Sequence, residues 1–219
     1  MVAEPNPITG LRWVRPVRER SHLLLGDITT AEGQVLRPFD VAEFALLRHA
    51  PQPPHVEDWI TEFVRRRPLV VRKLEGGRRS VFLRKHLDCA PAEVLDGQQR
   101  SLCLVSPEGF AGRFSLDSYT GKFDARVTFK LGGKTYAGPH GGGGMPVTDL
   151  RWRALGRTWL GGAGGAVGFG AEDLNRRFGI QELYLAIGLT RPYEGRCWPM
   201  VIGVHTVPDL QVTVDYQDL

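Results

Sequence analysis

The chain has 219 residues, of which 42% are hydrophobic and 24% are charged, and its formal net charge is +4. This is the ordinary balance of a globular protein with its own core. No apolar run approaches the roughly 18 residues that span a bilayer, and MVAEPNPITG has neither the basic start nor the apolar centre of a signal peptide. We therefore expect a cytoplasmic protein that does not span the membrane.

The first half of the chain predicts short strands separated by turns. The segment RWVRPV alternates with a period of two, and Pro16 ends it. Residues 56–63 place apolar side chains at helical spacing and predict a short amphipathic helix. A second small helix over 90–98 marks a boundary near residue 95. The predicted strands are 11–17, 22–28, 40–49, 68–75 and 79–85, and Gly76 and Gly77 form a hairpin turn between the last two.

The second half repeats this pattern. In KFDARVTFKL, apolar residues at 123, 125, 127 and 129 alternate with charged or polar ones, which predicts a half-buried strand. Residues 182–190 and 196–207 predict a central hairpin that turns at PYEG. The glycine-rich stretch 138–170 predicts a flexible loop that could close over a ligand, and 171–179 predicts a short helix that ends at Gly179.

Cysteine usage bounds the metal and redox chemistry. Cys89, Cys103 and Cys197 are scattered and odd in number, and they form no C-x-x-C pair. This pattern argues against a disulfide framework and against a structural zinc site. We expect free thiols, no metal and no cofactor.

Positive charge is concentrated in one segment. Residues 65–86 carry nine Lys or Arg against the single acid Glu75, so this segment is net +8 and the remainder is net −4. A GC-rich genome can raise arginine content, but it does not cluster charge. Nine cations cannot be buried without partners, so a solvent-facing basic hairpin is expected.

Aromatic and basic residues also interleave along the predicted strands. Trp13 lies between Arg12 and Arg15, and Trp152 between Arg151 and Arg153. Such spacing suits base stacking beside phosphate contacts, but the rings could equally belong to the core, with the cations on the wet face. We expect Arg12 and Arg15 to face solvent, Trp13 to be an anchor at the rim of a barrel, and Trp152 to be an exposed ring.

Several motifs, taken in order, resemble the dual OB-containing domain family. They are RWVRPV, PFDVAEFALL with PQPPHVEDW, TGKFDARVTF, VTDLRW and the closing hairpin LYLAIGLTRPYEGRCWPMVIGVH. The resemblance implies a two-barrel prokaryotic module that binds nucleic acid and is often a neighbour of defence or repair enzymes. It carries over no catalytic residue. It marks Trp13, Arg15, Pro16 and the TGKF positions Thr120, Gly121, Lys122 and Phe123 as structural, ligand-binding or both.

These observations together predict an all-β protein with a few short helices, built as two OB-like antiparallel barrels over residues 1–95 and 96–219. We expect a non-catalytic protein that binds single-stranded or structured DNA or RNA, beside a partner enzyme of defence or repair. The expected contact residues are Arg12, Trp13, Arg15, Arg65, Arg66, Arg67, Arg72, Lys73, Arg78, Arg79, Arg84, Lys85, Lys122, Arg126 and Trp152.

Two alternatives remain open at the level of sequence. The basic segment could dock an acidic protein partner, which would make the protein an adaptor. Asp149, Glu172 or Asp173 could instead hold a divalent metal in a nucleic-acid enzyme.

Overall fold

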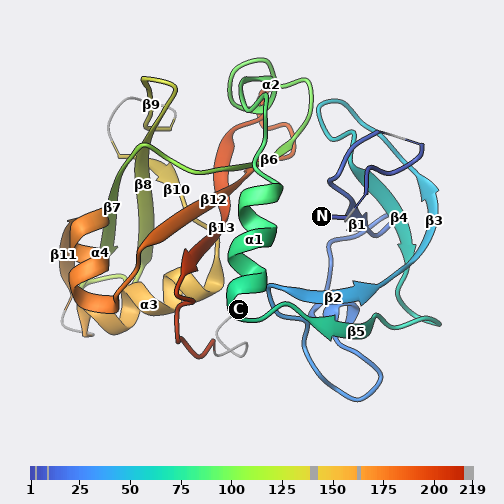
Figure 1. Cartoon of the computed structure of the whole chain (residues 1–219), viewed down its shortest axis with the longest axis horizontal. Coiled ribbons are helices and arrows are strands. Elements are labelled where there is room, and N and C mark those ends of the chain that lie inside the picture. The colour runs from blue at the N-terminus through green and yellow to red at the C-terminus, as the bar shows by residue number, and fades with distance from the viewer. Residues whose placement is uncertain (3, 9, 139–142, 162–163, 215–219) are drawn as a thin grey trace. The chain divides into compact units, whose positions relative to one another are not determined.

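The computed structural model describes residues 1–2, 4–8, 10–138, 143–161 and 164–214 (Figure 1). The chain divides into two compact units. Unit 1 comprises Met1–His86 with Gly97–Leu102, and unit 2 comprises Leu87–Asp96 with Cys103–Leu219. None of the helices that the structure describes is both long and apolar enough to cross a membrane.

The main sheet of unit 1 has β4 (Asp58–Glu62) at its centre. It runs parallel to β1 (Arg15–Val17) and antiparallel to β3 (Ala45–His49). The helix predicted over 56–63 is therefore wrong. Trp59, Thr61 and Phe63 are buried and Ile60 is half-buried, so both faces of the strand are covered. A strand covered on both faces loses the period of two that identifies a half-exposed strand.

A second sheet in unit 1 pairs β2 (Asp40–Glu43) with β5 (Leu69–Lys73). The predicted strands at 40–49 and 68–75 are confirmed, although Phe44 divides the first into β2 and β3. The strand predicted over 22–28 is wrong, because Leu25–Ile28 forms the short 3₁₀-helix η1.

Helix α1 (Gly77–Lys85) replaces the strand and basic hairpin predicted over 79–85. Gly76 adopts a φ of 52° before the helix, so the glycine pair starts a helix in place of turning a hairpin. Ser80, Leu83 and His86 are buried at three-residue spacing, whereas Val81 is 64% exposed. The inward-facing residues thus follow the helical period, which the surrounding charges obscure in the sequence.

The larger sheet of unit 2 has the order β10-β8-β7-β11, and β9 pairs with β8. Phe123, Ala125, Val127 and Phe129 are buried, which confirms the alternation predicted for β8. The bounds are β7 (Gly109–Leu116), β8 (Phe123–Leu131), β9 (Lys134–Tyr136), β10 (Met145–Pro146) and β11 (Gly165–Gly170).

A three-stranded sheet, β13-β12-β6, completes the strands of unit 2. The central hairpin predicted near the C-terminus is confirmed by the antiparallel pair β12 (Glu182–Leu189) and β13 (Pro199–Val207). Strand β6 spans Leu102–Val105, and the short helices α2 (Ala92–Leu95) and α4 (Ala171–Phe178) fall where they were predicted.

The glycine-rich stretch 138–170 is not one flexible loop. It contains β10, helix α3 (Leu150–Leu160) and β11, while its residues 139–142 and 162–163 lie outside the described part of the chain. Gly156 shows what one of these glycines does. A Cβ atom there would lie 2.6 Å from atoms of the Phe114 and Phe123 rings, so glycine lets α3 pack directly on the sheet.

Trp152 of α3 lies at the centre of the unit 2 core, with its side chain fully buried. Its ring centroid lies 5.4 Å from that of Phe114, 5.8 Å from that of Phe169 and 6.1 Å from that of Phe110. The predicted all-β class is confirmed, but within the described residues the sheets do not close into barrels. Closure would require the edge strands to pair with one another.

A buried carboxylate fastens the chain that follows α2 to the main sheet of unit 1. Glu57, just before β4, is 1% exposed. Its Oε1 accepts the amide protons of Ser101 at 2.9 Å and Leu102 at 3.0 Å, and its Oε2 accepts the Ser101 hydroxyl at 2.7 Å. Three donors from residues over forty positions away thus converge on one side chain, which satisfies its charge in the interior.

We predict that Glu57→Ala lowers the free energy of unfolding of unit 1 by roughly 3 kcal/mol, because three buried donors lose their acceptor. Glu57→Gln retains one acceptor oxygen and costs about 1 kcal/mol. Urea denaturation measures both effects. Glu75→Ala is the control, since Glu75 is exposed. Equal unfolding midpoints for Glu57→Ala and Glu75→Ala would show that the Glu57 contacts do not stabilise the fold.

Candidate nucleic-acid interface

Two arginines near the N-terminus neutralise buried carboxylates. The Nε of Arg15 donates to Asp58 at 2.5 Å, and the Asp58 side chain is 4% exposed. Arg18 donates to both oxygens of Asp27, each at 2.7 Å. Arg15 therefore contributes to the folded structure and is half-buried, although it was expected to face solvent, and its predicted contact with nucleic acid remains a prediction. The buried acid that binds it comes from 43 positions along the chain.

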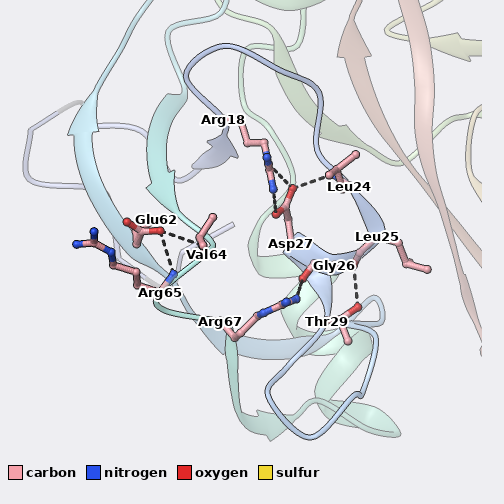
Figure 2. Close-up of polar contacts among 10 residues, drawn as sticks. All are labelled: Arg18, Leu24, Leu25, Gly26, Asp27, Thr29, Glu62, Val64, Arg65 and Arg67. Carbon is pink, nitrogen blue, oxygen red and sulfur yellow. Dashed lines mark hydrogen bonds and ion pairs between the residues drawn. The ribbon is translucent and has the colours of Figure 1, made fainter.

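Asp27 organises the segment around η1. In addition to Arg18, its carboxylate accepts the Leu24 amide proton at 2.8 Å, as Figure 2 shows. The hydrogen bonds from Arg18 lower the pKa of the Asp27 carboxyl below its ordinary value of 3.8, burial opposes this, and the Leu24 amide adds to the lowering. Asp27 thus remains ionised in the folded protein and holds the segment in place.

The turn between β4 and β5 is held from both sides. Glu62 Oε1 accepts the amide protons of Val64 at 2.9 Å and Arg65 at 3.1 Å, and these two bonds lower the pKa of Glu62. Arg67 donates to the carbonyl oxygen of Gly26. Figure 2 shows Arg67 reaching toward Gly26, while the Arg65 side chain extends away from the Asp27 cluster. The backbone of this turn is therefore fixed, and its arginines are not equivalent.

Phe39 connects the end of β5 to helix α1. Its carbonyl oxygen accepts the amide proton of Leu74 at 3.0 Å, and its ring meets Phe82 edge-on at 6.5 Å. The guanidinium carbon of Arg79 lies 4.1 Å from the Phe39 ring centroid, a cation–π contact. Phe39 thus links the chain that follows β5 to α1 and holds the guanidinium of Arg79.

A group of cations in unit 1 forms no ion pair with any described residue. These side chains are exposed and, within the described residues, make no side-chain hydrogen bond and no ion pair within 4.0 Å. We call them the unit 1 basic surface: Arg65, Arg66, Arg72, Lys73, Arg78 and Lys85. Arg84 of α1 is also exposed. These residues lie on the β4–β5 turn, β5 and α1. Arg67 and Arg79 are not members, because Arg67 bonds the Gly26 carbonyl oxygen and Arg79 packs on the Phe39 ring.

Unit 2 presents its own cations on the solvent face of β7 and β8. Lys122 is exposed, and the Nε of Arg126 donates to Asp124 at 2.8 Å. Arg113, which the sequence prediction missed, is exposed and lies directly opposite Arg126. Like charges in cross-strand register destabilise a sheet, so this pair favours an anionic neighbour. Pairing register could have revealed Arg113, but a single sequence does not supply it.

The two tryptophans do not form an exposed stacking surface. Trp152 is fully buried, so its predicted contact with a base is wrong. Trp13 and Arg12 are half-buried, and their predicted contacts with nucleic acid remain predictions. The most exposed rings among the described residues are Tyr119 at 97% and Tyr193 at 66%. Neither tyrosine lies in a regular strand, so strand periodicity could not identify it.

Of the three carboxylates considered for metal binding, Asp149 and Asp173 hold backbone amides in the fold, and Glu172 is exposed. Asp149 accepts the amide protons of Trp152 at 3.0 Å and Val204 at 2.9 Å, so it caps α3 and ties the helix to β13. Asp173 accepts the Gly170 amide proton at 2.8 Å. Among the described residues, no group of three or more His, Cys, Asp or Glu could hold a metal ion, and none of the three cysteines forms a disulfide.

Comparison with known proteins identifies a family. The sequence model described as Dual OB-containing domain matches residues 7–156, which confirms the resemblance seen in the motifs. No curated protein and no solved structure matches the chain significantly.

The lowered pKa of Asp27 predicts how acid affects unit 1. The contribution of this pair to stability is fully present above about pH 3.8, the ordinary value, and is lost as the pH falls through the lower folded-state pKa. Arg18→Gln raises the pKa of Asp27 and lowers the free energy of unfolding at neutral pH, because the Asp27 carboxylate loses the two hydrogen bonds that Arg18 donates to it.

Carboxyl ¹³C NMR titration and urea denaturation measure these two effects. Arg48→Gln is the matched control, because Arg48 pairs with Glu19 at 2.6 Å on the surface and does not contact Asp27. An Asp27 titration midpoint that is the same in Arg18→Gln and in the wild type would show that Arg18 does not lower the pKa of Asp27.

Proposed function

The chain belongs to the dual OB-containing domain family, and we propose that it binds nucleic acid through the unit 1 basic surface. The observation that carries this proposal is the division of its arginines into two classes. Arg15 and Arg18 neutralise buried acids. Among the described residues, Arg65, Arg66 and Arg72 form no ion pair within 4.0 Å, although the Glu62 carboxylate attracts the first two electrostatically. A fold that leaves several neighbouring cations unpaired is suited to a polyanion, since each phosphate bound releases condensed counterions.

The predominance of arginine over lysine in the unit 1 basic surface supports binding to phosphate. The planar guanidinium of arginine forms bidentate contacts with phosphate and stacks on rings, and four of the six members of the unit 1 basic surface are arginines. The Glu62 bonds fix the backbone of the turn that carries Arg65 and Arg66. The turn therefore loses little conformational entropy on binding.

The distribution of aromatic rings indicates which part of the nucleic acid this surface contacts. Most aromatic side chains of the described residues are buried or half-buried, and no exposed ring lies on the unit 1 basic surface. We propose that this surface binds the phosphate backbone of a single-stranded or structured nucleic acid without reading its bases. We further propose that the protein is a non-catalytic accessory beside a defence or repair enzyme, which rests on the family resemblance alone.

A protein partner is the second candidate, and one observation favours it. Val64, Leu69 and Val71 lie among the cations of the unit 1 basic surface and are 76%, 52% and 48% exposed. Apolar side chains mixed with arginine are typical of protein–protein interfaces. An acidic protein that also offers apolar side chains would fit this surface.

The proposed function predicts that binding of labelled single-stranded oligonucleotides weakens steeply with salt. Neutralising two cations in R65Q/R66Q lowers the slope of log K against log salt by about 1.4, because each lost phosphate contact on a single strand is worth about 0.7. Fluorescence anisotropy at several salt concentrations measures the slopes. Single-stranded DNA, single-stranded RNA and duplex DNA are compared to identify the ligand.

The matched control is R48Q/R176Q, which removes the same net charge. Arg48 already pairs with Glu19 at 2.6 Å, and Arg176 pairs with Asp173 at 3.1 Å. The control is expected to retain the wild-type slope. Flat titrations of the wild type with all three nucleic acids at low salt would overturn the proposed function and favour the acidic protein partner.

A further inference from the structure

The turn that joins β7 to β8 is a rigid platform in unit 2. Leu116 and Phe123 pair at its base, and the Asp117 amide donates to the Lys122 carbonyl oxygen at 3.0 Å. The Asp117 carboxylate accepts the amide protons of Thr120 at 2.7 Å and Tyr119 at 3.0 Å, and these bonds lower its pKa. Inside the turn, every one of these contacts restrains the backbone.

This turn presents an aromatic ring to solvent. The Tyr119 side chain is 97% exposed, while its amide is held by Asp117. Exposed single apolar residues are common and need no explanation by themselves. Here the ring stands on a restrained turn beside the exposed Lys122, a placement that suits stacking on a base.

Two arginines of α3 gather around the residue at the base of the same turn. Arg153 and Arg157 are four residues apart, so they lie on one face of the helix. Their guanidinium carbons lie 5.1 Å and 5.0 Å from the centroid of the Phe123 ring. Arg153 also donates to the Phe123 carbonyl oxygen at 3.3 Å. The ring therefore brings two positive charges close together.

Neither arginine of this pair forms an ion pair with a described residue. In the part of the chain that the structure describes, neither Arg153 nor Arg157 has a carboxylate within 4.0 Å, and the nearby Asp124 is bonded to Arg126 at 2.8 Å. Burial lowers the pKa of Arg153, the positive charge of Arg157 lowers it further, and Asp124 partly opposes both. Like charges at this spacing repel, so an anion bound between them would be favoured.

We infer that this end of unit 2 holds one nucleotide of a bound strand, with its phosphate on Arg153 and Arg157 and its base on Tyr119. The inference rests on the proposed function and adds a second contact region that is distinct from the unit 1 basic surface. Guanidinium groups suit the phosphate because each can donate two hydrogen bonds to its oxygens. The tyrosine ring suits any base, since every base offers a stacking face.

Two variants of the full chain test this site by fluorescence anisotropy with labelled oligothymidine. R153Q/R157Q is expected to lower the salt slope by at least about 0.7, the loss of one phosphate contact. Tyr119→Ala is expected to weaken binding about tenfold with an unchanged slope, and Tyr119→Phe to bind like the wild type. The matched charge control is again R48Q/R176Q, whose arginines are both ion-paired.

The outcomes separate this inference from the proposed function. If R65Q/R66Q weakens binding while R153Q/R157Q and Tyr119→Ala behave like the control, the unit 1 surface stands and the unit 2 site is overturned. If the wild type binds no oligonucleotide, NMR titration with thymidine 5′-monophosphate tests whether the unit 2 site exists. Saturable shifts of the Arg153 and Arg157 Nε–H signals in the wild type, together with Tyr119 amide shifts that are lost in R153Q/R157Q, would support the site, and the absence of saturable shifts would overturn it.

Discussion

The burial of three carboxylates is the constraint on which the rest of unit 1 depends. Asp27, Glu57 and Asp58 are 2%, 1% and 3% exposed. An ionised acid in the interior is costly unless it is paired and hydrogen-bonded, so each of them requires donors. Arg18 and Arg15 supply the donors for the two aspartates, and the Ser101–Leu102 backbone supplies them for Glu57. Satisfying these acids fixes η1, β1 and the start of β4.

The same constraint separates structural cations from available ones. Asp40 lies opposite Lys73 across β2 and β5, and Glu62 and Glu75 lie beside the β4–β5 turn and α1, yet in the described residues none of these acids forms an ion pair within 4.0 Å with the unit 1 basic surface. Glu62 bonds the backbone of that turn, which leaves the side chains of Arg65 and Arg66 without an ion pair among the described residues. In unit 2, the Phe123 ring gathers Arg153 and Arg157, again without an acid between them. The availability of a cation for a ligand is thus decided by where the acids lie.

A strand or helix was predicted correctly from the sequence when one of its faces packs on the core and the other is exposed to solvent. Strand β8 alternates because one face packs on the core and the other is solvated, whereas β4 is covered on both faces and so resembled a helix. In α1, the buried spacing of Ser80, Leu83 and His86 was obscured by the flanking cations, and the glycine pair suggested a hairpin. Local propensity could not resolve these cases, because tertiary burial decided them.

Site residues were predictable only to the level of charge clustering. Arg15 and Arg65 are the same residue type in equally basic surroundings, yet Asp58 binds one of them from 43 positions away. Trp152 was expected to be exposed but is buried, because its helix lies within a glycine-rich stretch that gave no helical signal. Nothing was predicted for Tyr119, which is exposed in a turn without periodicity. Such roles depend on contacts distant in sequence, which a single sequence does not reveal.

The most direct test of this division is arginine footprinting with phenylglyoxal and mass spectrometry, with and without oligonucleotide. We predict that Arg65, Arg66, Arg72 and Arg78 react in the free protein and are protected by the bound strand. Arg18, bonded to buried Asp27, should react slowly in both states. Equal reactivity of the four exposed arginines with and without every nucleic acid tried would contradict binding through the unit 1 basic surface.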